Sequence, residues 1–135
     1  MKQTFDTDSI LFQILNDSPA ILSAISGKVY IDERPDSSES EDIVVNTIAL
    51  TLDNPPQLGS SNVNIHVSDM DVQINGVQQK KKNRERLKLL AAIVVDVLKS
   101  AKIEGLALIV STQTTIKEPS ISQHYVNIRV DWVIH

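Results

Sequence analysis

The C-terminal segment, residues 121–134, alternates apolar and polar side chains with a period of two. A strand with one buried face and one solvent face produces this pattern. The apolar positions are Val126, Ile128, Val130, Trp132 and Ile134. Residues 106–116 form another strand pattern, and only Lys117–Ser120 separates the two segments, so we predict an antiparallel hairpin. The rest of the chain must then cover the apolar face of this hairpin.

Residues 80–100 carry apolar side chains at the three- and four-residue spacing of an amphipathic helix. The positions are Leu87, Leu90, Ala91, Val94, Val97, Leu98 and Ala101. Leu89 and Ile93 widen this apolar arc beyond a single stripe. We therefore expect the helix to be covered on more than one side, by a sheet and by a neighbouring subunit.

Further strands are predicted at residues 28–31, 43–52 and 61–67, and the second of them is expected to bury Val44, Ile48, Leu50 and Leu52. A helix over residues 8–16 precedes a helical turn that begins at Ser18-Pro19 and ends at Gly27. Residues 68–77 are expected to be a turn-rich connection. The 135 residues thus predict a single α+β domain, 1–135. Its mostly antiparallel sheet of about five strands packs on one long helix plus a short N-terminal helical segment.

Composition excludes several kinds of chemistry. The sequence has no cysteine, which excludes disulfides, thiolate metal sites and thiol nucleophiles. The formal net charge of −4 argues against a general nucleic-acid binder. Neither a phosphate-binding glycine loop nor a Gly-x-Ser-x-Gly nucleophile motif occurs. Residues 1–8 lack the features of a secretory signal, and no apolar run is long enough to span a membrane. We therefore expect a soluble intracellular protein that is not an enzyme and carries no metal or cofactor.

One alternative is catalytic. His66, Asp69 and Asp71 are the nearest approach to a metal-ligand set, with His124 far away in sequence. On a continuous strand His66 and Asp69 point to opposite faces, which favours ordinary surface or hydrogen-bonded roles. The alternative function is a small metal-dependent or nucleic-acid-processing enzyme that uses these three residues.

Two segments of opposite charge are the clearest polar features. The loop 32–42 is rich in acids that are expected to be solvated or paired with an external basic surface, and residues 80–88 are rich in bases. The basic segment could be a solvated helix end, could pair with acids on another subunit, or could contact nucleic acid. The two segments could also meet within one fold, or lie apart and form a head-to-tail interface. The candidate interface residues are Asp32, Glu33, Asp36, Glu39, Glu41, Asp42, Lys80, Lys81, Lys82, Arg84, Arg86 and Lys88.

Several short segments carry a family resemblance. They are Gly27–Tyr30, Arg34-Pro35, Ile43–Asn46 and Asn62–Val67, followed by the long helix and two terminal strands. In this order they resemble the tail-completion (tail-terminator) and head–tail joining proteins of tailed bacteriophages and prophages. The resemblance implies an α+β fold with a helix-packed sheet and a self-assembled ring, typically hexameric. It also implies tail-tube or connector partners, no membrane, and assembly into a particle in the cytoplasm of a bacterial host.

A third possibility is a small binding module that captures a partner strand on a free sheet edge. An unpaired edge at residues 43–52 or 121–134 would favour it.

Overall fold

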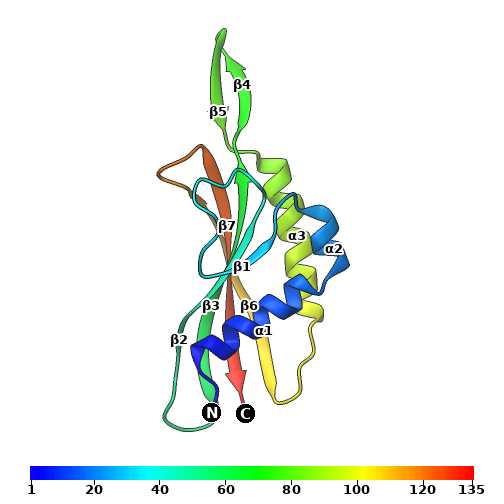
Figure 1. Ribbon diagram of the computed structural model, residues 1–135, viewed down its shortest axis with the longest axis vertical. Helices are drawn as coiled ribbons and strands as arrows, with labels where there is room; N and C mark the ends of the chain where they lie inside the picture. Colours follow the sequence, from blue (N-terminus) through cyan, green and yellow to red (C-terminus); the bar gives the residue numbers. More distant parts are fainter.

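The computed structural model describes all residues, 1–135, and has one five-stranded sheet with three helices on one face (Figure 1). The sheet order is β1-β2-β3-β7-β6. Its strands are β1 (Val29–Ile31), β2 (Ile43–Leu50), β3 (Gln57–Ser68), β6 (Leu106–Lys117) and β7 (Gln123–Ile134). The helices are α1 (Thr4–Asn16), α2 (Pro19–Ala24) and α3 (Arg84–Ser100). The predicted α+β class is confirmed, although the sheet is mixed because β1 pairs parallel with β2.

The predicted hairpin of the last two strands is confirmed. β6 and β7 pair antiparallel from Leu106↔Ile134 to Lys117↔His124, with one register shift between Val110 and Thr112. The apolar set of β7 is buried on the helix side, as the alternation predicts. β7 also pairs with β3 along its whole length, so it has no free edge. The sheet edges are β1 and β6 instead, which leaves the strand-capture hypothesis without its expected edge at residues 121–134.

The burial of β2 agrees with the prediction only in part, since Val44 is buried and Leu50 packs against the core. Ile43 and Val45 lie in the core, whereas Ile48 and Leu52 are exposed. The prediction assumed an unbroken period of two along this strand. A register shift between Thr47 and Ala49 interrupts that period. Thr47 is held by the hydroxyl groups of Thr7 and Ser61, at oxygen–oxygen distances of 2.6 and 2.8 Å. This partly buried position thus accepts a polar side chain because its hydroxyl is satisfied.

Residues 70–81 form a second hairpin, which corrects both the predicted connection at residues 68–77 and the predicted helix start at Lys80. β4 (Met70–Ile74) pairs antiparallel with β5 (Val77–Lys81) through a turn at Asn75-Gly76. Both turn residues have positive φ, 53° and 76°, as a tight two-residue hairpin turn requires. The long helix therefore starts at Arg84, not Lys80, and Asn83 caps it by accepting a hydrogen bond from the Arg86 amide.

α3 buries Leu87, Leu90, Ala91, Val94 and Leu98. The sheet covers one side of this arc, and α1 and α2 of the same chain pack on the helix as well (Figure 1). Leu89 stays exposed. Helices α1 and α2 of the same chain therefore cover part of the apolar surface of α3 that the sheet leaves open. Contact of a neighbouring subunit with this helix stays a prediction.

The N-terminal helical segment is longer than predicted, because α1 begins at Thr4. α2 begins as predicted, with Ser18 accepting a hydrogen bond from the Ile21 amide and Pro19 in the first turn. Gly27 is not a left-handed helix cap, since its φ is not positive. A β-carbon there would lie 2.0 Å from Oδ1 of Asp42, so the position needs glycine for a close approach. None of the three helices has the length and hydropathy needed to cross a membrane.

Candidate functional site

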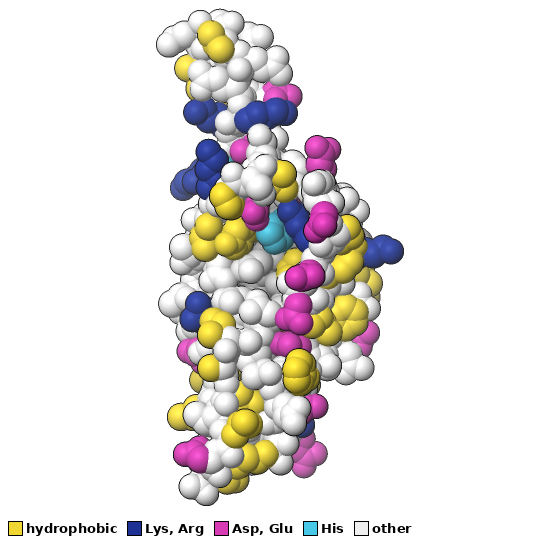
Figure 2. All heavy atoms as spheres, turned by 60° about the vertical axis from the view of Figure 1, so that its left-hand side comes forward, with side chains coloured by type: hydrophobic (Ala, Val, Ile, Leu, Met, Phe, Trp, Pro, Cys, Tyr) yellow, Lys and Arg dark blue, Asp and Glu magenta, His cyan; other side chains and the backbone are white.

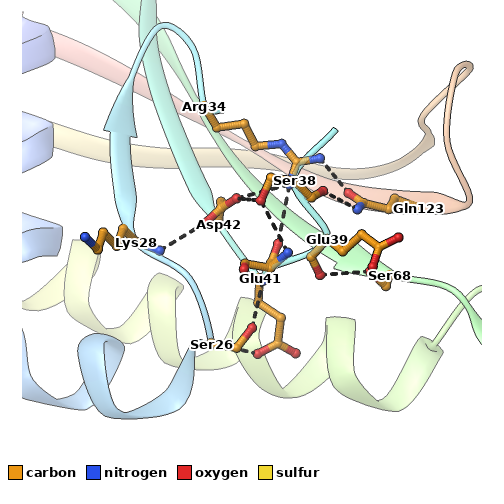
Figure 3. A network of polar contacts seen from close by, with 10 residues as sticks. Ser26, Lys28, Arg34, Ser38, Glu39, Glu41, Asp42, Ser68 and Gln123 are labelled. Atoms are coloured by element: carbon orange, nitrogen blue, oxygen red, sulfur yellow. Dashed lines mark hydrogen bonds and ion pairs between the residues drawn. The ribbon is translucent and has the colours of Figure 1, made fainter. Parts of the chain in front are cut away.

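The acidic loop, residues 32–42 between β1 and β2, is organised around Asp42 (Figure 3). This carboxylate is only 1% exposed and accepts three hydrogen bonds. The donors are the Lys28 amide at 3.1 Å, the Ser38 hydroxyl at 2.6 Å and Nη1 of Arg34 at 3.3 Å. The expectation that the loop's acids are solvated or paired outside the chain is therefore wrong for Asp42, because internal donors compensate its desolvation.

Arg34 also connects the acidic loop to the sheet. Its Nη2 donates to Oε1 of Gln123 at 2.5 Å, and Nε2 of Gln123 donates to the Ser38 carbonyl at 2.6 Å. Gln123 is the first residue of β7 and is almost fully buried. The hydroxyl of Ser68 at the end of β3 adds a bond to the Glu39 carbonyl at 3.0 Å. The loop is thereby fixed against the ends of two central strands (Figure 3).

Glu41 and Arg86 join the acidic loop to α3. The Glu41 carboxylate accepts from Nε and Nη2 of Arg86 at 2.6 and 2.8 Å, a bidentate pair. The hydrogen bond from Arg86 lowers the pKa of Glu41, and the same bond raises the pKa of Arg86. Arg86 further donates to the Ala24 carbonyl, and Glu41 accepts from the Ser26 amide. For this pair, the two oppositely charged segments meet within one fold.

The other predicted interface residues divide into one surface pair and a set without internal ion pairs. Lys80 pairs with Asp71 of its own hairpin at 2.7 Å, with both side chains about half exposed. The acids Asp32, Glu33, Asp36 and Glu39 are exposed and form no ion pair. The bases Lys81, Lys82, Arg84 and Lys88 are likewise exposed and form none. These eight residues remain available to a partner, whereas Asp42, Glu41 and Arg86 are engaged inside the chain.

A hollow of about 370 Å³ lies between the acidic loop and the sheet face that carries no helix. We call it the acidic hollow; its lining includes Asp32, Glu33, Asp36, Glu118, His66 and Tyr125. Figure 2 shows this face, with a histidine side chain lying among acidic ones. Arg34 is the only basic residue of the lining, so negative charge dominates the hollow.

His66, Asp69 and Asp71 each have separate surroundings. The ring of His66 lies 5.0 Å from that of Tyr125, in the acidic hollow. Oδ1 of Asp69 forms a hydrogen bond with Nδ1 of His124 at 2.6 Å, and Asp71 pairs with Lys80. No group of three histidine, aspartate or glutamate side chains in the chain could hold a metal ion. The structure therefore does not bring together the three residues of the catalytic alternative, and the pair Asp69–His124 went unpredicted because 55 residues separate its members.

The buried imidazole of His66 makes stability dependent on pH. The side chain is 7% exposed and its Nδ1 has no hydrogen-bond partner. Burial is the main cause that lowers the pKa of His66 from 6.5 to about 4, assisted by the nearby Arg34 and opposed by Asp42. Between pH 6.5 and about pH 4 the imidazole is protonated in the unfolded chain but neutral in the folded chain. The free energy of unfolding therefore falls as the pH is lowered through this range.

We expect the titration of His66 to lower the free energy of unfolding by about 2 kcal/mol between pH 7 and pH 5. Urea unfolding at both pH values measures the difference. His66→Phe keeps a ring against Tyr125 but removes the titration, so its loss over the same range should be smaller by that amount. An equal loss in the variant and the original protein would rule out His66 as the cause.

Comparison with known proteins bears on the whole fold. No protein-family model matches the sequence, and no curated protein matches it. Among solved structures, the chain is similar to one described as "Virion of native gene transfer agent (GTA) particle". The TM-score is 0.62 at 12% sequence identity, over 94% of this chain and 92% of that chain. At this identity the likeness is one of fold, and it extends over nearly the full length of both chains.

Proposed function

We propose that the protein is a non-enzymatic structural component of a phage or phage-like particle. The observation that carries this proposal is the fold likeness to a chain of a gene transfer agent virion, which covers 94% of one chain and 92% of the other. Nearly complete coverage in both directions means that no additional large domain distinguishes the two folds. The separation of His66, Asp69 and Asp71 removes the geometric basis of the catalytic alternative.

The finer role that we propose is a ring of identical copies at the tail end or the head–tail junction, with tail-tube or connector proteins as partners. The unpaired charges support self-association. Among the candidate interface residues, the acids without an internal ion pair lie on the acidic loop, and the bases without one lie on β5, the start of α3 and the residue between them. Two different surfaces that complement each other give a head-to-tail contact, and such a contact closes into a ring when the rotation permits.

Native mass spectrometry and light scattering over a range of concentrations test the ring, and negative-stain microscopy shows its shape. We expect a closed oligomer whose dissociation increases with salt, because exposed charge pairs are screened. A protein that stays monomeric at every concentration, alone and with tail-tube or connector proteins, would contradict the proposed ring.

Charge reversal at Arg84 and Lys88 gives a sharper test. We expect the double variant Arg84→Glu, Lys88→Glu to associate about tenfold more weakly or worse, since repulsion replaces attraction at two positions. At Arg84, the first residue of α3, glutamate is favourable to the helix dipole, and circular dichroism checks that the double variant keeps its helix. The matched control is Lys99→Glu, Lys102→Glu, in the last turn of α3 and just beyond it, which should leave the mass of the assembly unchanged.

A further inference from the structure

The β4–β5 hairpin extends away from the body of the molecule, beyond the end of the sheet (Figure 1). Its two five-residue strands pair with each other and form a separate two-stranded sheet. An isolated two-stranded hairpin is only marginally stable in water, because it has nothing to pack its side chains against. A partner surface would supply that packing.

One face of the hairpin is apolar. Because paired residues share a face, Met70, Val72, Ile74 and Val77 lie together, with Gln79 and Lys81 toward the body. Met70 is 44% exposed, Ile74 39% and Val77 59%. The tip of the hairpin therefore presents aliphatic side chains to solvent at its most distant point.

The opposite face of the hairpin is polar. It carries Asp71, Gln73, Gln78 and Lys80, and the ion pair Asp71–Lys80 lies across its two strands. Lys81 has no such partner and lies on the apolar face. The apolar face thus combines an aliphatic tip with one unpaired cation at its base.

The acidic hollow has the complementary chemistry. Four carboxylate side chains line it, from Asp32, Glu33, Asp36 and Glu118, against the single guanidinium of Arg34, which is already bonded to Asp42 and Gln123. An apolar side chain adjoins it. Ile116 is 38% exposed and pairs across the strands with Tyr125 of the lining.

We propose that the β4–β5 hairpin of one copy docks in the acidic hollow of a second copy. The apolar tip lies against Ile116 and Tyr125, and Lys81 lies among the carboxylates. The hairpin of a chain points away from that chain's own body, so the hollow it fills belongs to another copy (Figure 1). This inference rests on the proposed self-assembly and specifies its contact, in which each copy donates a hairpin and receives one.

The first test compares the two faces of the hairpin. In the double variant Ile74→Asp, Val77→Asp, charges replace the apolar tip, and we expect dissociation to increase by at least about a hundredfold. The matched control Gln73→Asp, Gln78→Asp places the same two charges on the opposite face, one residue pair closer to the body. It should assemble as the original protein does. Both variants should keep the circular dichroism of the original, because all four side chains lie outside the core.

The second test uses the absence of cysteine, which makes any introduced thiol unique. One preparation carries Val77→Cys and the other Ile116→Cys, and the two are mixed before oxidation. We expect a disulfide-linked pair that contains one copy of each variant. If copies of Val77→Cys instead form disulfides mainly with one another, then hairpins contact hairpins and the proposed contact is wrong.

The outcomes separate the two proposals. A ring that forms equally well with Ile74→Asp, Val77→Asp refutes the hairpin contact but leaves the structural function intact. A protein that is monomeric under all conditions, alone and with tail-tube or connector proteins, refutes both the ring and the hairpin contact. Loss of assembly in the tip variant alone, together with the mixed disulfide, supports the hairpin contact.

Discussion

Replacement of Asp42 by alanine is expected to lower the free energy of unfolding by about 3–5 kcal/mol, the range for breaking a buried, hydrogen-bonded ion pair. The substitution leaves the Lys28 amide and the Ser38 hydroxyl without an acceptor. It also removes the counter-ion of Arg34, whose side chain is only 11% exposed. Gln123 is then the remaining side-chain partner of this guanidinium. A charge without its counter-ion in such a place is costly.

Urea unfolding monitored by the fluorescence of Trp132, the only tryptophan, measures this loss. Glu39→Ala is the matched control, because its exposed side chain belongs to the same loop and forms no ion pair. It should change stability by less than about 0.5 kcal/mol. If Asp42→Ala loses no more than Glu39→Ala, Asp42 does not anchor the loop.

Gly27→Ala is expected to cost about 3 kcal/mol, at the upper end of the range for overpacking a tight site. The new β-carbon would lie 2.0 Å from Oδ1 of Asp42 and 2.7 Å from the Glu41 carbonyl oxygen. The backbone cannot easily move aside, because the Gly27 amide donates to that same carbonyl at 3.0 Å. Either the carboxylate leaves its three donors or the loop separates from β1.

The variant Gly105→Ala is the control for Gly27→Ala. Gly105 has a φ of 82° and nothing within 4 Å of the added carbon, so its cost should be only the conformational one, about 1 kcal/mol. The double variant Gly27→Ala, Asp42→Ala provides a second check, because it should lose less than the sum of the two single losses. Strict additivity would mean that the two positions do not act through the same contact.

Much of the fold follows from periodicity. The alternation in residues 121–134 and 61–67 correctly predicts two central strands, and the helical spacing between Leu87 and Leu98 correctly predicts the buried side of α3. The β4–β5 hairpin has a local signal in the sequence, Asn75-Gly76 between Ile74 and Val77. The predicted helix, residues 80–100, wrongly includes Lys80 and Lys81, which belong to β5.

The candidate site was less predictable, for a physical reason. Charge along the sequence identifies which residues are ionic but not which of them meet. Glu41 and Asp42 are neighbours, yet one reaches Arg86 on α3 and the other turns to the loop's own donors. Such contacts depend on how the loop folds over the ends of β3 and β7, and no short-range pattern encodes that arrangement.

The position of β7 between β3 and β6 also constrains when the molecule can fold during synthesis. β3 emerges from the ribosome well before its partner, and Ile65 meets Val126 only after about sixty further residues have been made. Until then β3 lacks a neighbour on one side, and the apolar face of α3 lacks much of the surface that it packs on. Pairing between distant segments forms slowly and leaves aggregation-prone strands exposed. The nascent chain therefore depends on rapid synthesis of its C-terminal strands, or on chaperones, more than a helical protein of the same size would.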